Sequence, residues 1–424
     1  FNDRQSFFIH FKICATHPYN NCTIILEHNL SFGIQFKPVY LLPFLMKVPA
    51  KDTILKNALF GLVFALLLLP WLEQNEHIFE PRPLGGVQPN SQKVQFSAEQ
   101  WRSAKFQEGQ EAYIRDHFGL RPFMVRFYNE LFDRVFGEYQ ANGVIMGKDG
   151  YLFEENYLLA ASGQDYIGLD SISRLVSDLN LIKLDLAKLG KHLLVCIAPG
   201  KGSFYPDKMP SEYRYNGSLG RNYPDFVRAL KNQEIALFDV QDWFLKMKAT
   251  AKYPLYPKTG IHWSSYGEYL VADSLIRNLA QLTNKDFPKM ELKKIEKSNI
   301  PRDRDDDIEL GMNLLRNLPD FEMAYPQFEI KPLSKGKKAP KVLVIGDSFY
   351  YGMYNWGMMQ HVFEGGEFWY YNHERLVPGK ASSYLKDVKD YKALVKEFDV
   401  VVLLLTEANL PRFGFGMMPT YLKD

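Results

Sequence analysis

Three runs of apolar residues predict buried β-strands. They cover residues 192–198, 341–346 and 399–406, and each is too apolar to face water on either side. A shorter run at 235–240 follows the same pattern. Strands that are apolar on both faces are typical of parallel sheets covered by helices. The pattern therefore predicts an α/β fold with a mostly parallel sheet.

Apolar residues at helical spacing predict helices between these strands. One helix covers residues 172–186, and Gly190 follows it as a candidate C-cap. A second covers 265–282, where Ser265 and Glu268 have the spacing of a capping box. Residues 100–137 are also predicted to be helical, with a break at 118–122. Residues 143–153 have the strand–turn–strand pattern of a hairpin.

An unbroken apolar run at 58–72 follows Lys47, Lys51 and Lys56, which is the pattern of a secretory signal or signal anchor. A membrane-spanning helix needs about 20 residues, and Ile54 and Leu55 lengthen the run towards that value. No small-residue cleavage signal follows it. Basic residues before the run place its N-terminal side in the cytoplasm. We therefore expect a single-pass inner-membrane anchor with the rest of the chain in the periplasm.

These patterns divide the chain into four parts. Residues 1–45 precede the first methionine, Met46, and are interpreted as a leader or an upstream extension. Residues 46–74 form the predicted anchor, and residues 75–99 form a linker rich in Pro and Gly. Residues 100–424 form the predicted α/β domain.

Composition excludes several classes of protein. Among 424 residues, 51 Lys and Arg stand against 49 Asp and Glu, so the net charge of +2 gives no reason to expect nucleic acid as a partner. Three cysteines exclude a disulfide scaffold, and Cys196 lies within a predicted strand. The acidic run at 303–307 lacks the glycine and the glutamate of a calcium-binding loop, so we expect a solvated loop. No metal or cofactor is predicted.

A serine and a histidine stand where a sheet of this kind places its active site, beyond the carboxyl ends of strands. Ser348 follows the predicted strand at 341–346, and Gly346 and Asp347 before it are expected to position the serine and its oxyanion site. Its backbone N–H lies at a predicted helix start, where it would stabilise an oxyanion. His262 lies on a loop before the helix at 265–282. Each motif alone is weak, since Asp347 and Ser348 could simply cap a helix, but together they form a possible nucleophile and base.

Five separated motifs resemble the SGNH-hydrolase-like O-acetyltransferases of the AlgX/AlgJ type, which are related to the DHHW proteins. The motifs occur in the family's order, with the histidine before the serine, at residues 116–121, 147–153, 198–206, 260–263 and 346–349. The resemblance implies an SGNH-like α/β/α sandwich. It also implies transfer of acetyl groups to an exported polysaccharide, with a membrane-bound O-acyltransferase as the partner that supplies acetyl.

One position departs from the family pattern. Family members usually carry Asp two residues before the histidine, and this chain has Gly260 there. Three interpretations stay open at this point. Another carboxylate, Glu407 or Asp239, replaces the triad acid; or a backbone carbonyl holds the ring of His262 and leaves a Ser/His dyad; or the domain binds glycan without catalysis.

Other residues are candidates for contacts with the substrate. Lys201 follows a predicted strand and could meet an anionic group, although a turn lysine is often merely solvated. Trp263 and Tyr351 could stack on sugar rings, as could Tyr350, Tyr354 and Trp356, some of which must face the core at helical spacing. The predicted function is O-acetyl transfer through an acyl-enzyme on Ser348. A carbohydrate acetyl-esterase and a non-catalytic glycan-binding subunit are the alternatives.

Overall fold

A computed structural model describes residues 53–76, 79, 82–86, 91–137, 139–319 and 321–423. The interpretation of residues 1–45 as a leader or extension concerns residues outside this part. From residue 65 onward the described residues belong to one compact unit, and the fold below is that of this unit. The division at 46–74, 75–99 and 100–424 remains a prediction.

A seven-stranded sheet organises the fold. Its strand order is β10-β9-β8-β7-β11-β3-β4. The five neighbouring strands β8, β7, β11, β3 and β4 pair in parallel. At the other edge of the sheet, β9 pairs antiparallel with β8, and β10 pairs antiparallel with β9. The strands are β3 (His192–Ala198), β4 (Ala236–Asp239), β7 (Val342–Gly346), β8 (Glu367–Tyr370), β9 (Glu374–Leu376), β10 (Ser383–Tyr384) and β11 (Val400–Thr406). The predicted mostly parallel sheet is confirmed.

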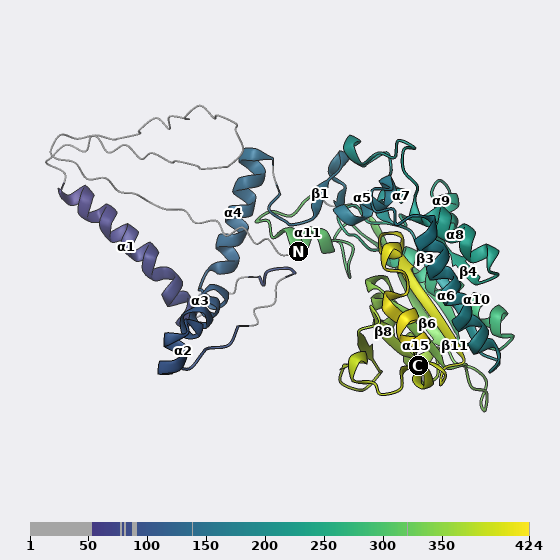
Figure 1. Cartoon of the computed structure of the whole chain (residues 1–424). Helices are drawn as coiled ribbons and strands as arrows, with labels where there is room; N and C mark the ends of the chain where they lie inside the picture. The colour runs from purple at the N-terminus through teal and green to yellow at the C-terminus, as the bar shows by residue number, and fades with distance from the viewer. Residues whose placement is uncertain are drawn as a thin grey trace. The chain divides into compact units, whose positions relative to one another are not determined.

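The central strand β11 shows why both faces of the sheet are covered. Successive side chains of a strand point to opposite faces, and Val402 and Leu404 belong to one hydrophobic cluster while Leu403 and Leu405 belong to another. All four are fully buried. Figure 1 shows β11 in yellow with helices packed around it. Strands without a polar face require this layered arrangement.

Helices from different parts of the chain form the two outer layers. The cluster with Leu403 includes residues of α6 (Leu169–Ala187), α8 (Asn222–Asn232), α14 (Tyr391–Val395) and α15 (Met417–Lys423). The cluster with Leu404 includes residues of α9 (Val240–Met247), α10 (Ser265–Thr283), α12 (Tyr351–Asn355) and α13 (Met358–His361).

The remaining helices and strands do not belong to the main sheet. The helices are α1 (Thr53–Glu76), α2 (Ala98–Arg102), α3 (Lys105–His117), α4 (Arg121–Phe136), α5 (Glu155–Ser162), α7 (Lys201–Phe204) and α11 (Asp307–Met312). Two antiparallel hairpins pair β1 (Val144–Met146) with β2 (Leu152–Glu154), and β5 (Lys289–Ser298) with β6 (Met323–Lys331). Short 3₁₀ turns cover 148–150, 211–213, 348–350, 385–387 and 407–416.

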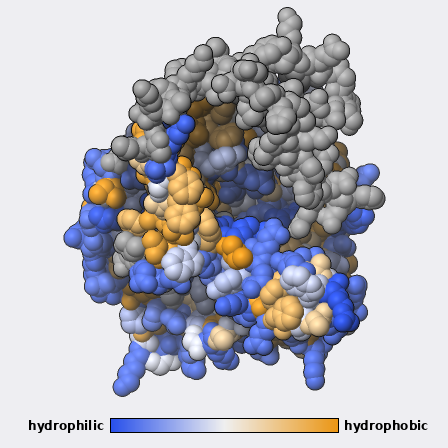
Figure 2. Space-filling view, turned by 90° about the vertical axis from the view of Figure 1, so that its left-hand side faces the viewer, coloured by the Kyte–Doolittle hydropathy of each residue, from blue (hydrophilic) through white to orange (hydrophobic). Residues whose placement is uncertain are grey.

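Helix α1 is compatible with a single-pass membrane anchor. Its residues Leu55–Glu76 are long and apolar enough to cross a bilayer, at 1.5 Å of rise per residue. Its large apolar side chains are exposed, among them Phe60 and Leu67 at more than 70%. Figure 2 shows hydrophobic groups exposed among hydrophilic ones on the side of the molecule that it presents. Exposure of this kind suits contact with lipid better than contact with water.

The structure refines several local predictions. The hairpin at 143–153 is confirmed, and the break in the helical region at 118–122 separates α3 from α4. A second break separates α2 from α3. The N-cap of α10 is Ser264, whose hydroxyl accepts a hydrogen bond from the Gly267 N–H, so the capping box predicted at Ser265 and Glu268 is wrong by one residue. The β5–β6 hairpin was not predicted, and the segment between its strands contains α11 and contributes to the site.

Candidate active site

The carboxyl ends of β7 and β11 position the candidate nucleophile. The two strands are parallel neighbours, and Gly346 at the end of β7 pairs with Leu404. A Cβ atom on Gly346 would lie 2.9 Å from the carbonyl oxygen of Leu404, so the strands approach closely at this point. Ser348 then opens the 3₁₀ turn 348–350, as the sequence predicted for the start of a helix. The turn is short, and α12 continues from it.

Asp347 fixes the turn that carries this serine. Its buried carboxylate accepts hydrogen bonds from the backbone N–H of Phe349 at 3.1 Å and of Thr406 at 2.7 Å, and from Asn409 Nδ2 at 2.7 Å. Burial raises the pKa of Asp347, and these hydrogen bonds partly oppose the rise. Because the three donors come from the turn itself and from the end of β11, Asp347 connects the turn of Ser348 to that strand end.

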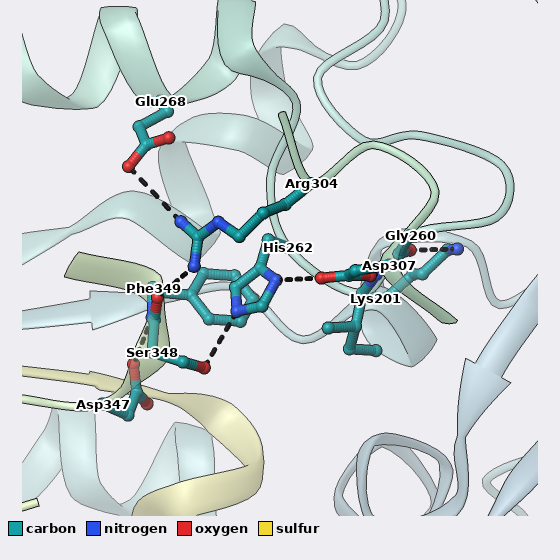
Figure 3. Close-up of polar contacts among 10 residues, drawn as sticks. Lys201, Gly260, His262, Glu268, Arg304, Asp307, Asp347, Ser348 and Phe349 are labelled. Atoms are coloured by element: carbon teal, nitrogen blue, oxygen red, sulfur yellow. Dashed lines mark hydrogen bonds and ion pairs between the residues drawn. The ribbon is translucent and has the colours of Figure 1, made fainter. Parts of the chain in front are cut away.

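Ser348, His262 and an aspartate lie in a line. His262 Nε2 is 2.9 Å from Ser348 Oγ, and His262 Nδ1 is 2.5 Å from Asp307 Oδ2. Figure 3 shows the imidazole between the two side chains. Asp307 also accepts a hydrogen bond from the Ile261 N–H at 2.8 Å. This is the geometry of a nucleophile, a general base and an orienting acid.

The protonation states suit this arrangement. Burial lowers the pKa of His262, although the contact with Asp307 opposes the shift, so the imidazole is neutral at physiological pH. Burial by itself would raise the pKa of Asp307, but the hydrogen bonds from His262 and the Ile261 N–H, together with the charge of Arg304, hold it below its usual value. An ionised Asp307 therefore stands beside a neutral His262, which can accept a proton from Ser348.

Gly260 explains why the acid comes from another segment. A Cβ atom at this position would lie 2.6 Å from the carbonyl oxygen of Arg304 and 2.8 Å from that of Asp305. The backbone that leads to Asp307 thus occupies the space that a side chain at position 260 would need. Since Asp307 is the first residue of α11, the segment that fills this space also delivers the carboxylate.

Arg304 connects the same segment to the nucleophile. Its guanidinium donates a hydrogen bond to the backbone carbonyl of Ser348 at 2.7 Å, and its other terminal nitrogen lies 3.7 Å from Glu268 Oε1. Figure 3 shows Arg304 between these two residues. Burial raises the pKa of Glu268 to about 7, and the charge of Arg304 opposes the rise. Arg304 therefore holds the turn at Ser348 from the side opposite to Asp347.

Lys201 supports the loop of His262 instead of meeting solvent. Its ammonium group is fully buried and donates hydrogen bonds to the carbonyl oxygens of Lys258 at 2.9 Å and Gly260 at 2.6 Å. Burial lowers the pKa of Lys201 to about 7. The expected contact between Lys201 and an anionic group of the substrate is therefore wrong, because both sides of the ammonium group face the protein's own backbone.

The predicted replacements for the triad acid lie elsewhere. Glu407 is 1% exposed and approaches Gly200, where it would be 2.6 Å from an added Cβ atom, and burial raises its pKa. Asp239 caps α9 and accepts a hydrogen bond from the hydroxyl of Tyr223 at 3.0 Å. The structure places neither carboxylate against His262. Of the three interpretations, a substitute carboxylate is the one that the geometry supports, since Asp307 is the carboxylate that contacts His262.

The predicted stacking residues are largely occupied by core packing. Trp263 is 2% exposed and packs edge-on against Phe349 at a centroid distance of 5.0 Å. Tyr350 is fully buried. Tyr351 packs against Tyr370 at 5.0 Å and does not line the pocket at Ser348. Neither Trp263 nor Tyr351 therefore offers a ring face at the serine.

A pocket of about 280 Å³ opens at Ser348 and contains residues that the sequence did not suggest. Asn409 and Arg412 follow β11, and Tyr371 follows β8. Asn409 Oδ1 accepts a hydrogen bond from Arg412 at 2.6 Å, and Asn409 Nδ2 donates to Asp347 and to Thr406 Oγ1. The sequence could have indicated these three pocket residues only through their positions just after parallel strands, because the carboxyl ends of such strands meet at one edge of the sheet.

Asp307 was missed because its surroundings were misread. The acidic run at 303–307 looked like a solvated loop, yet Asp305 is 1% exposed, and burial raises its pKa to about 8. Asp303 accepts a hydrogen bond from the hydroxyl of Ser265 at 2.7 Å, so the run packs onto the start of α10. In the described residues, no group of three or more His, Cys, Asp or Glu side chains could hold a metal ion.

Comparison with known proteins identifies the family. The model of the family described as "SGNH hydrolase-like domain, acetyltransferase AlgX" matches residues 144–361 of the 424 residues. The chain belongs to this family. It is an acyltransferase of the AlgX type, as its motifs suggested, and its sheet and helices form the SGNH-like α/β fold. A comparison with curated proteins gives no match.

Three solved structures are similar to this member of the AlgX family. The O-acetyltransferase domain of Pseudomonas putida AlgJ is 20% identical, with 63% of this chain and 92% of that chain covered and a TM-score of 0.43. Bacillus cereus PatB1 is 11% identical, with 64% and 98% covered and a TM-score of 0.42. Pseudomonas aeruginosa AlgX is 15% identical, with 65% of each chain covered and a TM-score of 0.41.

The close approach at Gly260 predicts that a side chain there is not tolerated. Gly260→Ala should lower the free energy of unfolding by about 1–3 kcal/mol through overpacking, because the added methyl meets the backbone of Arg304 and Asp305. Thermal unfolding measures this change. Gly311→Ala is the matched control, since a Cβ atom on Gly311 has no neighbour within 4 Å. Equal melting temperatures for the two variants would contradict the close approach.

The lowered pKa of His262 predicts an acid-shifted pH profile. The base works only when the imidazole is neutral, so the acylation rate should fall as the pH drops through the pKa of His262. Because burial lowers that pKa, the midpoint should lie below the reference value of about 6.5. The release of 4-nitrophenolate from 4-nitrophenyl acetate, followed across this range, gives the midpoint. A midpoint above the reference value would contradict a neutral, buried base.

Proposed function

We propose that this protein is a membrane-anchored O-acetyltransferase that transfers acetyl groups to hydroxyls of an exported or cell-envelope polysaccharide. The line from Asp307 through His262 to Ser348 is the observation that carries the proposal. Membership in the AlgX acetyltransferase family supports the reaction type. The exposed apolar helix α1 supports a single-pass anchor, with the catalytic domain in the periplasm and the anchor in the inner membrane.

The first half-reaction forms an acyl-enzyme. Ser348 Oγ attacks the carbonyl carbon of the acetyl donor while His262 Nε2 takes the serine proton. The bond between the carbonyl carbon and the donor's leaving group then breaks, and the leaving group takes a proton from His262. Asp307 stabilises the imidazolium that exists between these two transfers. In this scheme a membrane-bound O-acyltransferase is the partner that supplies acetyl from the membrane side.

The second half-reaction moves the acetyl group to the glycan. A sugar hydroxyl gives its proton to His262 Nε2 and attacks the acyl carbonyl. The ester bond to Ser348 breaks, and Ser348 Oγ recovers a proton from His262. In both halves the Ser348 N–H stabilises the negative charge on the carbonyl oxygen. Tyr371 lines the same pocket as Ser348.

The alternatives differ from this proposal in defined ways. A carbohydrate acetyl-esterase would use the same Ser348 and His262 with water as the acceptor, so only the product distinguishes it from a transferase. The non-catalytic alternative rested on the missing aspartate at position 260. The contact of Asp307 with His262 argues against it, because an orienting carboxylate is present although it comes from another segment.

Acylation of Ser348 is the direct test of the proposal. The full chain, incubated with 4-nitrophenyl acetate, should gain the mass of one acetyl group, and Ser348→Ala and His262→Ala should not. Intact-mass spectrometry followed by peptide mapping locates the adduct. With oligosaccharides added, acetylated sugar supports a transferase, whereas free acetate alone supports an esterase. A folded chain that neither gains an adduct nor turns over the ester would exclude both.

The identity of the acid gives a second prediction. Asp307→Asn should slow acylation by about 10⁴-fold, because the amide cannot stabilise the imidazolium and favours the wrong tautomer. The rate of the 4-nitrophenolate burst measures the effect. Asp306→Asn is the matched control, since Asp306 is the adjacent carboxylate and does not contact His262. If Glu407→Gln, and not Asp307→Asn, abolished the burst, Asp307 would not be the acid.

A further inference from the structure

The pocket at Ser348 is too small for more than a short part of a polymer. Its volume is about 280 Å³, near the lower limit of ligand pockets, which is about 300 Å³. An acetyl group and the sugar unit that receives it would fill this space. The adjacent units of a polysaccharide acceptor must then lie on the surface next to the pocket.

One neighbouring hollow shares two lining residues with the pocket. It has a volume of about 450 Å³, and Tyr371 and Arg412 line both spaces. Three other surface hollows, near Phe118, Trp356 and Leu315, share no lining residue with the pocket at Ser348. Of these four hollows, only the one beyond Tyr371 and Arg412 shares residues with the catalytic serine's pocket.

The lining of this hollow suits a sugar ring. Phe415 and Tyr371 are partly exposed and meet edge-to-face at a centroid distance of 5.1 Å. The exposed guanidinium of Arg412 lies 5.4 Å from the centre of the Tyr371 ring and is held by Asn409. Aromatic faces with a few fixed polar groups at the edge are typical of ligand-binding sites, and pyranose rings combine apolar C–H faces with hydroxyl edges.

The backbone around the hollow is held in an unfavourable conformation. Tyr371 and Phe415 have φ of +50°, in the left-handed region that bulky side chains rarely adopt, and Asn372 between β8 and β9 has the same φ, which asparagine adopts more readily. The Asn372 amide donates a hydrogen bond to the Phe415 carbonyl at 3.3 Å, and the Tyr391 hydroxyl donates to Asn372 Oδ1 at 2.6 Å. Such strain persists only where neighbours enforce it and is concentrated at binding sites. Here the contacts fix the two aromatic rings next to each other.

We infer that this hollow is an acceptor subsite, in which Phe415 stacks on a pyranose unit adjacent to the one being acetylated, beside Tyr371 and Arg412. The inference rests on the proposed function and adds the direction in which the acceptor chain leaves the serine. The glycan runs from Ser348 past Tyr371 and Arg412 to Phe415. Specificity for length follows, because a monosaccharide cannot reach Phe415 while it occupies the pocket at Ser348.

Phe415→Ala tests the subsite. The full chain is kept in a detergent without a sugar head group, and the acceptors are cellohexaose, hexagalacturonate and the corresponding monosaccharides. The loss of one stacking ring should raise KM for the preferred hexasaccharide about three- to tenfold. The acylation burst with 4-nitrophenyl acetate and the KM for the monosaccharide should stay within about twofold. Phe415→Tyr should restore KM.

Controls separate the subsite from the chemistry. Tyr384→Ala removes another exposed aromatic ring, on β10, and should change neither KM nor the burst. An unchanged KM for the hexasaccharide in Phe415→Ala overturns the subsite. A slowed burst also overturns it, since the hollow would then serve the donor and not the acceptor.

Direct binding distinguishes failure of the subsite from failure of the proposed function. If the unmodified chain forms no acyl-enzyme, the proposed function fails. The subsite is then tested separately by measuring the affinity for the two hexasaccharides by calorimetry. Affinity retained in Ser348→Ala and reduced in Phe415→Ala supports the subsite. If neither hexasaccharide binds at millimolar concentration, the proposed subsite is overturned.

Discussion

The contact between Asp307 and His262 is the constraint on which the site depends. It exists because the backbone at Arg304 and Asp305 lies where a side chain at position 260 would be. The glycine at position 260 lacks the carboxylate of the family pattern, and because it has no side chain it also leaves room for the segment that carries Asp307. The departure from the family pattern and the position of Asp307 therefore have one structural cause.

The same segment also reaches the nucleophile. Arg304 donates a hydrogen bond to the backbone carbonyl of Ser348. The Asp347 carboxylate accepts hydrogen bonds from backbone N–H groups of the turn and of the end of β11. The side chains of the proposed base, acid and nucleophile are thus held by neighbouring parts of one hydrogen-bonded framework. Preorganisation of this kind reduces the reorganisation that the protein must undergo as charge develops in the transition state.

Several charged groups are buried or half-buried around the site, and their pairing explains how the fold tolerates them. Lys201 is fully enclosed but donates to two backbone carbonyls, and Arg304 lies between Glu268 and the carbonyl of Ser348. Burying a charge is costly unless it is paired or hydrogen-bonded. These groups are best understood as supports that hold the loops of His262 and Ser348, which is why Lys201 is not free to bind a substrate.

The sequence alone predicted the layered fold, which the structure confirms, and it singled out Ser348 and His262 as the candidate nucleophile and base. Apolar runs at 192–198, 341–346 and 399–406 allow no other environment than a sheet covered on both faces, and Ser348 and His262 stand in short motifs whose local chemistry is readable. Only the tertiary structure shows that Asp307 contacts His262, that Lys201 and Arg304 hold the loops of the site, and that a hollow lies beside Phe415. Asp307 lies 45 residues from His262 in a run that resembles a solvated loop. The spacing of residues in the sequence does not show that this run, which lies between β5 and β6, packs against Gly260. Such a contact between distant segments depends on how whole elements pack together.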